Sequence, residues 1–92
     1  MEEKKRFRFR FSGIVQGVGF RYTAYHLAAV LGLTGWVYNE WDGSVLVEVQ
    51  GAPSTISQFV ERLDGSRFIH IDDIEKKELP LDRGEVSFSI RF

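Results

Sequence analysis

A glycine-rich stretch followed closely by an arginine is the feature of this sequence best suited to chemistry. Gly13, Gly17 and Gly19 fall within seven residues, and Arg21 comes next, at the start of a helical pattern. The main-chain amides of a glycine loop that enters a helix point in one direction, and the helix dipole adds about half a positive charge there. Arg21 would add a planar fork of hydrogen-bond donors. The stretch therefore predicts a site for an anion, and phosphate is the commonest one.

Asn39 is the second candidate, because it ends an expected strand in phase with Val37 and its amide can both donate and accept hydrogen bonds. The same residue could instead only shape the turn that Asp42-Gly43 indicates. The glycine stretch is not a P-loop, since no Gly-Lys-Ser/Thr follows it. The stretch is not a dinucleotide-binding fingerprint either, because no parallel βαβ unit with an acidic residue for the ribose follows it.

Composition limits the remaining classes of function. The chain has 92 residues, 43% of them hydrophobic, which predicts a single domain over residues 1–92. The absence of cysteine excludes disulfides, thiolate metal sites and a cysteine nucleophile. A net charge of −1 gives no overall attraction to nucleic acid, and no apolar run is long enough for a membrane span. We therefore expect a cytoplasmic protein without a nucleic-acid or membrane partner.

The elements that must hold these candidates follow from hydrophobic periodicity. Residues 6–11 alternate between arginine and phenylalanine, which predicts a strand with its phenylalanines inward and its arginines outward. Apolar positions at helical spacing run from Phe20 to Leu31, and Gly32 is placed to end that helix. Strands over residues 33–39 and 45–50 are expected on either side of a hairpin turn.

The second half of the chain gives a second helix and further strand. Pro53 suits the first turn of a helix that Gly65 ends. Residues 68–78 read as a strand whose pattern slips, and a bulge near Asp72-Asp73 would repair the register. Residues 86–92 alternate again, so that the following side chains are expected to meet the helices with those of the first strand: Val86, Phe88, Ile90 and Phe92.

The order of elements is β-α-β-β-α-β. Two right-handed βαβ crossovers interleaved in one sheet define the ferredoxin-like fold, a split βαβ sandwich of the α+β class. We therefore predict an antiparallel sheet with two helices on one face.

The residues quoted above resemble a known family. Gly13-Ile14-Val15-Gln16-Gly17-Val18-Gly19-Phe20-Arg21, then Gly35-Trp36-Val37-Tyr38-Asn39 with Asp42-Gly43-Ser44-Val45 and Gly51, closely resembles the two signatures of the acylphosphatases. The resemblance extends over the whole chain, including its length and its terminal Phe-Ser-Ile-Arg-Phe. It implies an enzyme that hydrolyses acyl phosphates to a carboxylate and inorganic phosphate.

The resemblance also implies a role for each site residue. Arg21 matches the family's phosphate-binding arginine, and Asn39 matches its water-orienting asparagine. The phosphate-binding loop is expected to use the main-chain amides of Gln16, Gly17, Val18, Gly19, Phe20 and Arg21. A loose phosphoryl transition state needs charge stabilisation and positioning more than acid catalysis, so no metal and no cofactor are expected. The expected partner is a small-molecule acyl phosphate, and the expected state is a monomer.

Two departures and two alternatives accompany this interpretation. Glu40 follows the asparagine where relatives commonly have small or neutral residues, and residues 65–74 lack a turn that many relatives show. A single-stranded RNA-binding module has the same β-α-β-β-α-β order, but residues 45–50 lack the aromatics of its recognition motif. The carbamoyl-phosphate-handling domain of hydrogenase-maturation proteins usually has proline after the arginine, where this chain has Tyr22.

Overall fold

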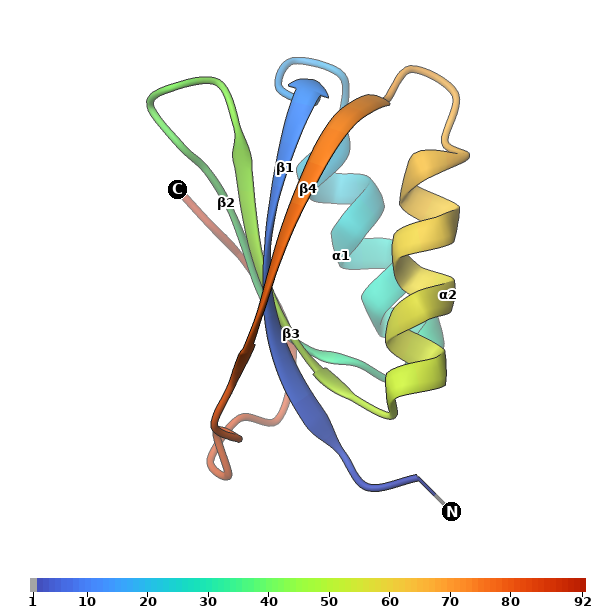
Figure 1. Cartoon of the computed structure of the whole chain (residues 1–92), viewed down its shortest axis with the longest axis vertical. Coiled ribbons are helices and arrows are strands. Elements are labelled where there is room, and N and C mark those ends of the chain that lie inside the picture. Colours follow the sequence, from blue (N-terminus) through green and yellow to red (C-terminus); the bar gives the residue numbers. More distant parts are fainter. Residues whose placement is uncertain (1) are drawn as a thin grey trace.

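The computed structural model describes residues 2–92, so the first residue of the predicted domain lies outside the described residues. Its elements are β1 (Lys5–Ile14), α1 (Phe20–Leu31), β2 (Thr34–Asn39), β3 (Val45–Gly51), α2 (Pro53–Asp64), β4 (His70–Leu79) and β5 (Phe88–Arg91). The strands form one sheet in the order β4-β1-β3-β2-β5, and both helices lie on the same side of it (Figure 1). The predicted β-α-β-β-α-β order and the ferredoxin-like arrangement are confirmed from β1 to β4, and β5 is a fifth strand at the edge beside β2.

The sheet is mixed rather than wholly antiparallel. β1 pairs antiparallel with β3 and β4, and β2 pairs antiparallel with β3, whereas β5 runs parallel to β2. The predicted bulge is also present, because Ser12 pairs with Asp73 and Gly13 pairs with Ile71. Asp72 is therefore the extra residue, and it explains why the apolar pattern of this strand changes phase.

The core lies between the sheet and the helices. Phe11, Phe59, Val37 and Val47 are fully buried there, and Phe20 of α1 packs against Phe11 with ring centroids 5.2 Å apart. Each helix ends directly before its predicted glycine, Gly32 for α1 and Gly65 for α2. Gly32 adopts the left-handed conformation typical of a helix end. No helix within residues 2–92 is long and apolar enough to cross a membrane.

Two predictions about the last strand are wrong. Val86 is 89% exposed and Phe92 is 85% exposed, so neither packs into the core between the sheet and the helices. The reason is that β5 spans only Phe88–Arg91, and within it Phe88 is buried and Ile90 is half-buried. Alternation continued past both ends of the strand that actually forms.

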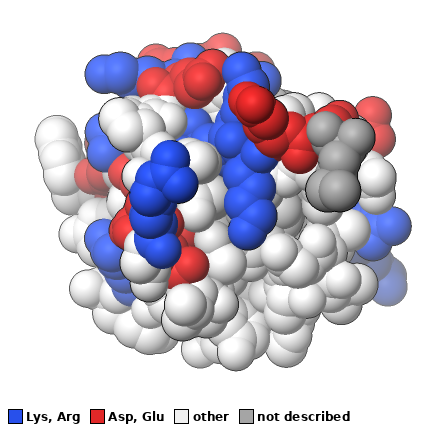
Figure 2. All heavy atoms as spheres, turned by 90° about the horizontal axis from the view of Figure 1, so that it is seen from below, with Lys and Arg blue, Asp and Glu red and all other residues white. Residues whose placement is uncertain are grey.

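The outward position of the first-strand arginines needs one correction. Arg6 is only 4% exposed, because the connection between β4 and β5 folds over it. Its guanidinium bonds to both Glu85 oxygens at 2.7 and 3.1 Å and to Glu48 at 3.0 Å. That connection lies at the lower end of the molecule in Figure 1, and Figure 2, seen from that end, shows basic and acidic side chains lying beside one another.

Candidate active site

The connection between β1 and α1 forms a cradle of hydrogen-bond donors. Gly17 and Gly19 have φ of 74° and 79°, a left-handed backbone conformation that residues other than glycine rarely adopt. Gly19 is the N-cap of α1, and no side chain caps it. The amide of Thr23 makes the first helical bond, 3.0 Å to the Gly19 carbonyl, so the amides before it have no acceptor within the helix. The cradle thus offers donors and the positive end of a helix dipole.

A small cavity brings the two predicted catalytic residues together. It has a volume of about 130 Å³ and is lined by Val15, Gly17, Gly19, Phe20, Arg21, Tyr22 and Asn39. Arg21 comes from the first turn of α1 and Asn39 from the last residue of β2. Of the six residues predicted to bind phosphate, Gly17, Gly19, Phe20 and Arg21 line this cavity, and Gln16 and Val18 do not.

Asn39, one of the residues that line this cavity, carries an unsatisfied polar atom. Its Oδ1 is buried and has no hydrogen-bond partner among residues 2–92. A buried acceptor without a partner costs about 1–3 kcal/mol, so such groups are rare outside functional sites. A donor held in the cavity, such as a water molecule, would satisfy the oxygen.

The guanidinium of Arg21 contacts an aromatic ring and forms no ion pair within residues 2–92. Its Cζ lies over the ring of Phe92, 4.9 Å from the centroid, and its side chain is half-buried. No carboxylate in the described part of the chain lies within 4.0 Å of its guanidinium nitrogens. The guanidinium is therefore not neutralised by a neighbouring carboxylate, while the aromatic ring restricts its position.

The side chain of Gln16 has a role that the sequence did not reveal. Its Nε2 donates to the carbonyl oxygens of Glu40 at 2.7 Å and Ser44 at 2.8 Å, at the two ends of the β2–β3 turn. Within that turn, Asp42 Oδ1 accepts from Ser44 Oγ at 2.6 Å and from the Ser44 amide at 3.0 Å. These bonds lower the pKa of the Asp42 carboxyl below its ordinary value of 3.8. The one signal in the sequence was that Gln16 is a polar residue in a loop that is otherwise apolar and rich in glycine.

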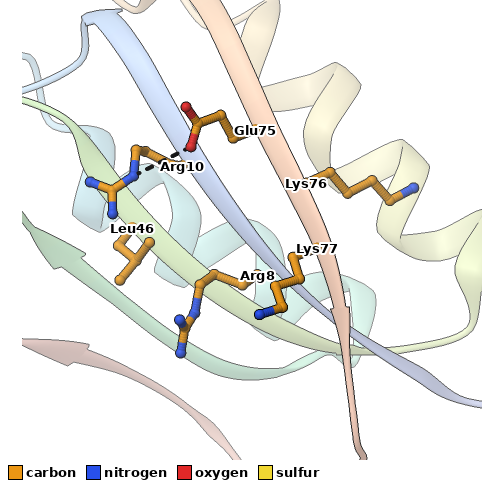
Figure 3. A pocket seen from close by; sticks show the side chains of 6 residues that line it. All are labelled: Arg8, Arg10, Leu46, Glu75, Lys76 and Lys77. Atoms are coloured by element: carbon orange, nitrogen blue, oxygen red, sulfur yellow. Dashed lines mark ion pairs between the residues drawn. The ribbon is translucent and has the colours of Figure 1, made fainter.

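A second hollow, of about 220 Å³, lies on the helix-free face of the sheet (Figure 3). Arg8, Arg10 and Lys77 line it, as the RNA-binding alternative would require of a basic surface. However, Arg8 pairs with Glu48 at 2.6 Å, and Arg10 lies 3.7 Å from Glu75. The charges of both arginines are thus matched by neighbouring carboxylates, which leaves this hollow a poor site for a polyanion.

The chain thus has a ferredoxin-like α+β fold, with a glycine-containing loop and a small cavity at the N-terminus of α1. The chain belongs to the acylphosphatase family, since the model of that family, described as Acylphosphatase, matches residues 7–90. An acylphosphatase from Clostridium perfringens is 45% identical over 85 residues, which cover 91% of this chain and 96% of that protein.

Solved structures agree with this assignment. The crystal structure of acylphosphatase from Bacillus subtilis superposes with a TM-score of 0.88 at 36% identity, covering 96% of this chain and 99% of that one. HypF from T. kodakarensis matches with a TM-score of 0.83 at 34% identity, over 96% of this chain but only 12% of HypF. Neither alternative drawn from the sequence is favoured by these likenesses, because relatives matched over nearly their full length are acylphosphatases.

Proposed function

We propose that this chain hydrolyses acyl phosphates to a carboxylate and inorganic phosphate, at the cavity that Arg21 and Asn39 share. The observation that carries the proposal is the buried, unpaired Oδ1 of Asn39, because Asn39 and Arg21 line the same small cavity. The Oδ1 of Asn39 can accept a hydrogen bond from a water molecule, and the guanidinium of Arg21 can hold an anion beside that water. Family membership supports the choice of substrate class.

The phosphoryl group would lie in the cradle. The amides of residues 16–21 and the guanidinium of Arg21 donate hydrogen bonds to its non-bridging oxygens, and the helix dipole adds favourable potential. These groups stabilise the negative charge that a loose transition state spreads over those oxygens. They are held in place before substrate arrives, so little reorganisation is needed during the reaction.

Asn39 would place the attacking water. Its Oδ1 accepts a hydrogen bond from the water, whose oxygen attacks phosphorus in line with the carboxylate leaving group. The bond from phosphorus to the carboxylate oxygen breaks, and the carboxylate leaves with the electron pair. The water's proton passes to a phosphate oxygen of the substrate, so no protein base, metal or cofactor takes part. Alignment and charge stabilisation supply the rate enhancement.

The decisive experiment measures hydrolysis of benzoyl phosphate and acetyl phosphate by the wild type, Arg21→Gln and Asn39→Ala. Loss of two or more charge-assisted contacts at about 1.5–3 kcal/mol each predicts at least a 100-fold fall in kcat/KM for Arg21→Gln. Asn39→Ala should lower kcat and leave the inhibition constant of inorganic phosphate nearly unchanged. Lys77→Gln, on the helix-free face, is the control that removes a positive charge elsewhere.

Three outcomes would contradict parts of the proposal. A wild type without turnover would remove the enzyme assignment. Loss of activity in EDTA would remove the metal-free mechanism, and full activity of Asn39→Ala would make Asn39 a turn residue only.

We further propose that residues 1–92 form one acylphosphatase-like domain that acts as a cytoplasmic monomer and binds neither nucleic acid nor membrane. The match to the family model over residues 7–90 supports the single domain. The edge strand β4 carries charged side chains along His70–Leu79, which disfavours pairing with another chain's edge. The absence of cysteine suits a reducing compartment. Analytical ultracentrifugation tests the monomer, and a retardation assay with single-stranded RNA tests the absence of nucleic-acid binding.

A further inference from the structure

The side chain of Gln16 joins the two halves of the site. Both hydrogens of its Nε2 are used, one on the Glu40 carbonyl at 2.7 Å and one on the Ser44 carbonyl at 2.8 Å. Glu40 and Ser44 also bond to each other, with the Glu40 amide 2.9 Å from the Ser44 carbonyl. The amide group of Gln16 therefore holds a closed turn at both of its ends.

The two connected segments carry different parts of the site. Gln16 precedes Gly17 directly in the β1–α1 connection, where the donors of the cradle lie. Glu40 follows Asn39 directly, so a shift of its carbonyl moves the last residue of β2 as well. Gly17 and Gly19 confer little stiffness of their own on the loop, because glycine has no side chain to limit its backbone. A fixed spacing between cradle and Asn39 thus needs a tie between the segments.

We propose that Gln16 is a positioning residue that sets the distance and direction from the phosphate cradle to the water held by Asn39. The proposal rests on the function proposed above. It means that Gln16 acts on the alignment of the attacking water with phosphorus, and only weakly on the binding of phosphate itself. Misplacement of a reacting group by about 1 Å can lower a rate 100-fold, so the loss of this tie should be visible in kcat.

The test replaces Gln16 with Ala, which removes both donors, and with Met, which keeps the length of the side chain and also lacks the donors. Both variants should lower kcat by about 10- to 100-fold, with the inhibition constant of inorganic phosphate changed by less than about threefold. Circular dichroism and thermal unfolding verify that each variant is folded at the assay temperature. Full kcat in folded Gln16→Met would overturn the proposal.

Gln50 supplies a matched control at the other end of β3. Its Nε2 donates to the Asp82 carbonyl at 3.0 Å, and its Oε1 accepts from the Asp82 amide at 2.8 Å. Gln50 thus also ties a strand to a connection through two bonds, but away from the cavity. Gln50→Ala should lower the thermal midpoint and leave kcat within about twofold of wild type. An equal fall in kcat for Gln50→Ala and Gln16→Ala would show that general loosening, not positioning, is responsible.

A double-mutant cycle with Asn39 tests the route by which Gln16 acts. If Gln16 acts through Asn39, Gln16→Ala should lower kcat in the wild type and have less than about a twofold effect in Asn39→Ala. Independent, multiplicative losses would overturn the positioning role while leaving the proposed function intact. Full activity of Asn39→Ala alone would instead overturn the proposed role of Asn39, and the role of Gln16 with it.

Discussion

The guanidinium of Arg21 lies over the exposed ring of Phe92, with Cζ 4.9 Å from the ring centroid. The contact joins the helix that carries the candidate phosphate ligand to the residue directly after β5. An exposed arrangement of this kind is worth about 0.5–1 kcal/mol, and it also limits the rotamers of a long side chain. Phe92 is therefore part of the support of the site although it lies outside the core.

Phe92→Ala should raise KM for acyl phosphates about two- to fivefold, because Arg21 would have to be ordered on binding. Phe92→Trp should retain or improve affinity, since an indole ring attracts a guanidinium more strongly. Phe68→Ala is the matched control, because Arg67 lies over that ring at 5.2 Å. The measurement is steady-state kinetics with benzoyl phosphate, and equal KM values for all four proteins would contradict a role for the ring.

Local pattern was enough to predict the helices, most strand positions and the bulge. The apolar spacing ended α1 at Leu31, as found, and the change of phase between Ile71 and Ile74 reported the extra residue Asp72. Both signals involve neighbours in sequence. The parallel pairing of β5 with β2 could not be obtained in this way, since alternation reports which face is buried and says nothing of the partner strand.

Side chains that contact distant segments were the other limit. Arg6 looked like an outward, solvated strand residue, but its partner Glu85 is 79 residues away in sequence. Gln16 reaches carbonyls 24 and 28 residues away, and a main-chain acceptor leaves no mark on residue type. Asn39 was ambiguous for a related reason, because an asparagine that shapes a turn and one that faces a cavity look alike in sequence.

Arg21→Lys tests whether the geometry of the guanidinium matters beyond its charge. A lysine keeps the positive charge but loses the planar fork that matches two phosphate oxygens. Loss of one charge-assisted bond at about 1.5–3 kcal/mol predicts a fall in kcat/KM of about 10- to 150-fold. Arg67→Lys, the same change beside an aromatic ring at an exposed position, should leave kcat/KM unaltered. Activity of Arg21→Lys within twofold of wild type would mean that only the charge is used.

Arg6→Met tests the buried ion network under the β4–β5 connection. Burial alone would lower the pKa of Arg6, but its hydrogen bonds to Glu85 and Glu48 outweigh burial and raise it. Removing the arginine leaves Glu85 mostly buried without this partner, and breaking a buried pair costs about 3–5 kcal/mol. Arg8 also pairs with Glu48, but the side chain of Arg8 is 45% exposed. Arg8→Met should therefore lower the free energy of unfolding by at most about 1 kcal/mol. Urea unfolding measures both, and equal losses would contradict the difference in burial.

Asp42→Asn tests how the turn after Asn39 depends on pH. Because the hydrogen bonds of Ser44 lower the pKa of Asp42 in the folded protein, the carboxylate stabilises the fold above its ordinary pKa of 3.8. That contribution is lost as the pH falls below 3.8 and through the lower pKa of the folded state. The thermal midpoint of wild type should therefore exceed that of Asp42→Asn at pH 7, and the gap should narrow at pH values below about 3.8. Asp64→Asn, at the exposed end of α2, controls for the loss of one negative charge. A gap that stays constant across this range would show that the carboxylate does not hold the turn.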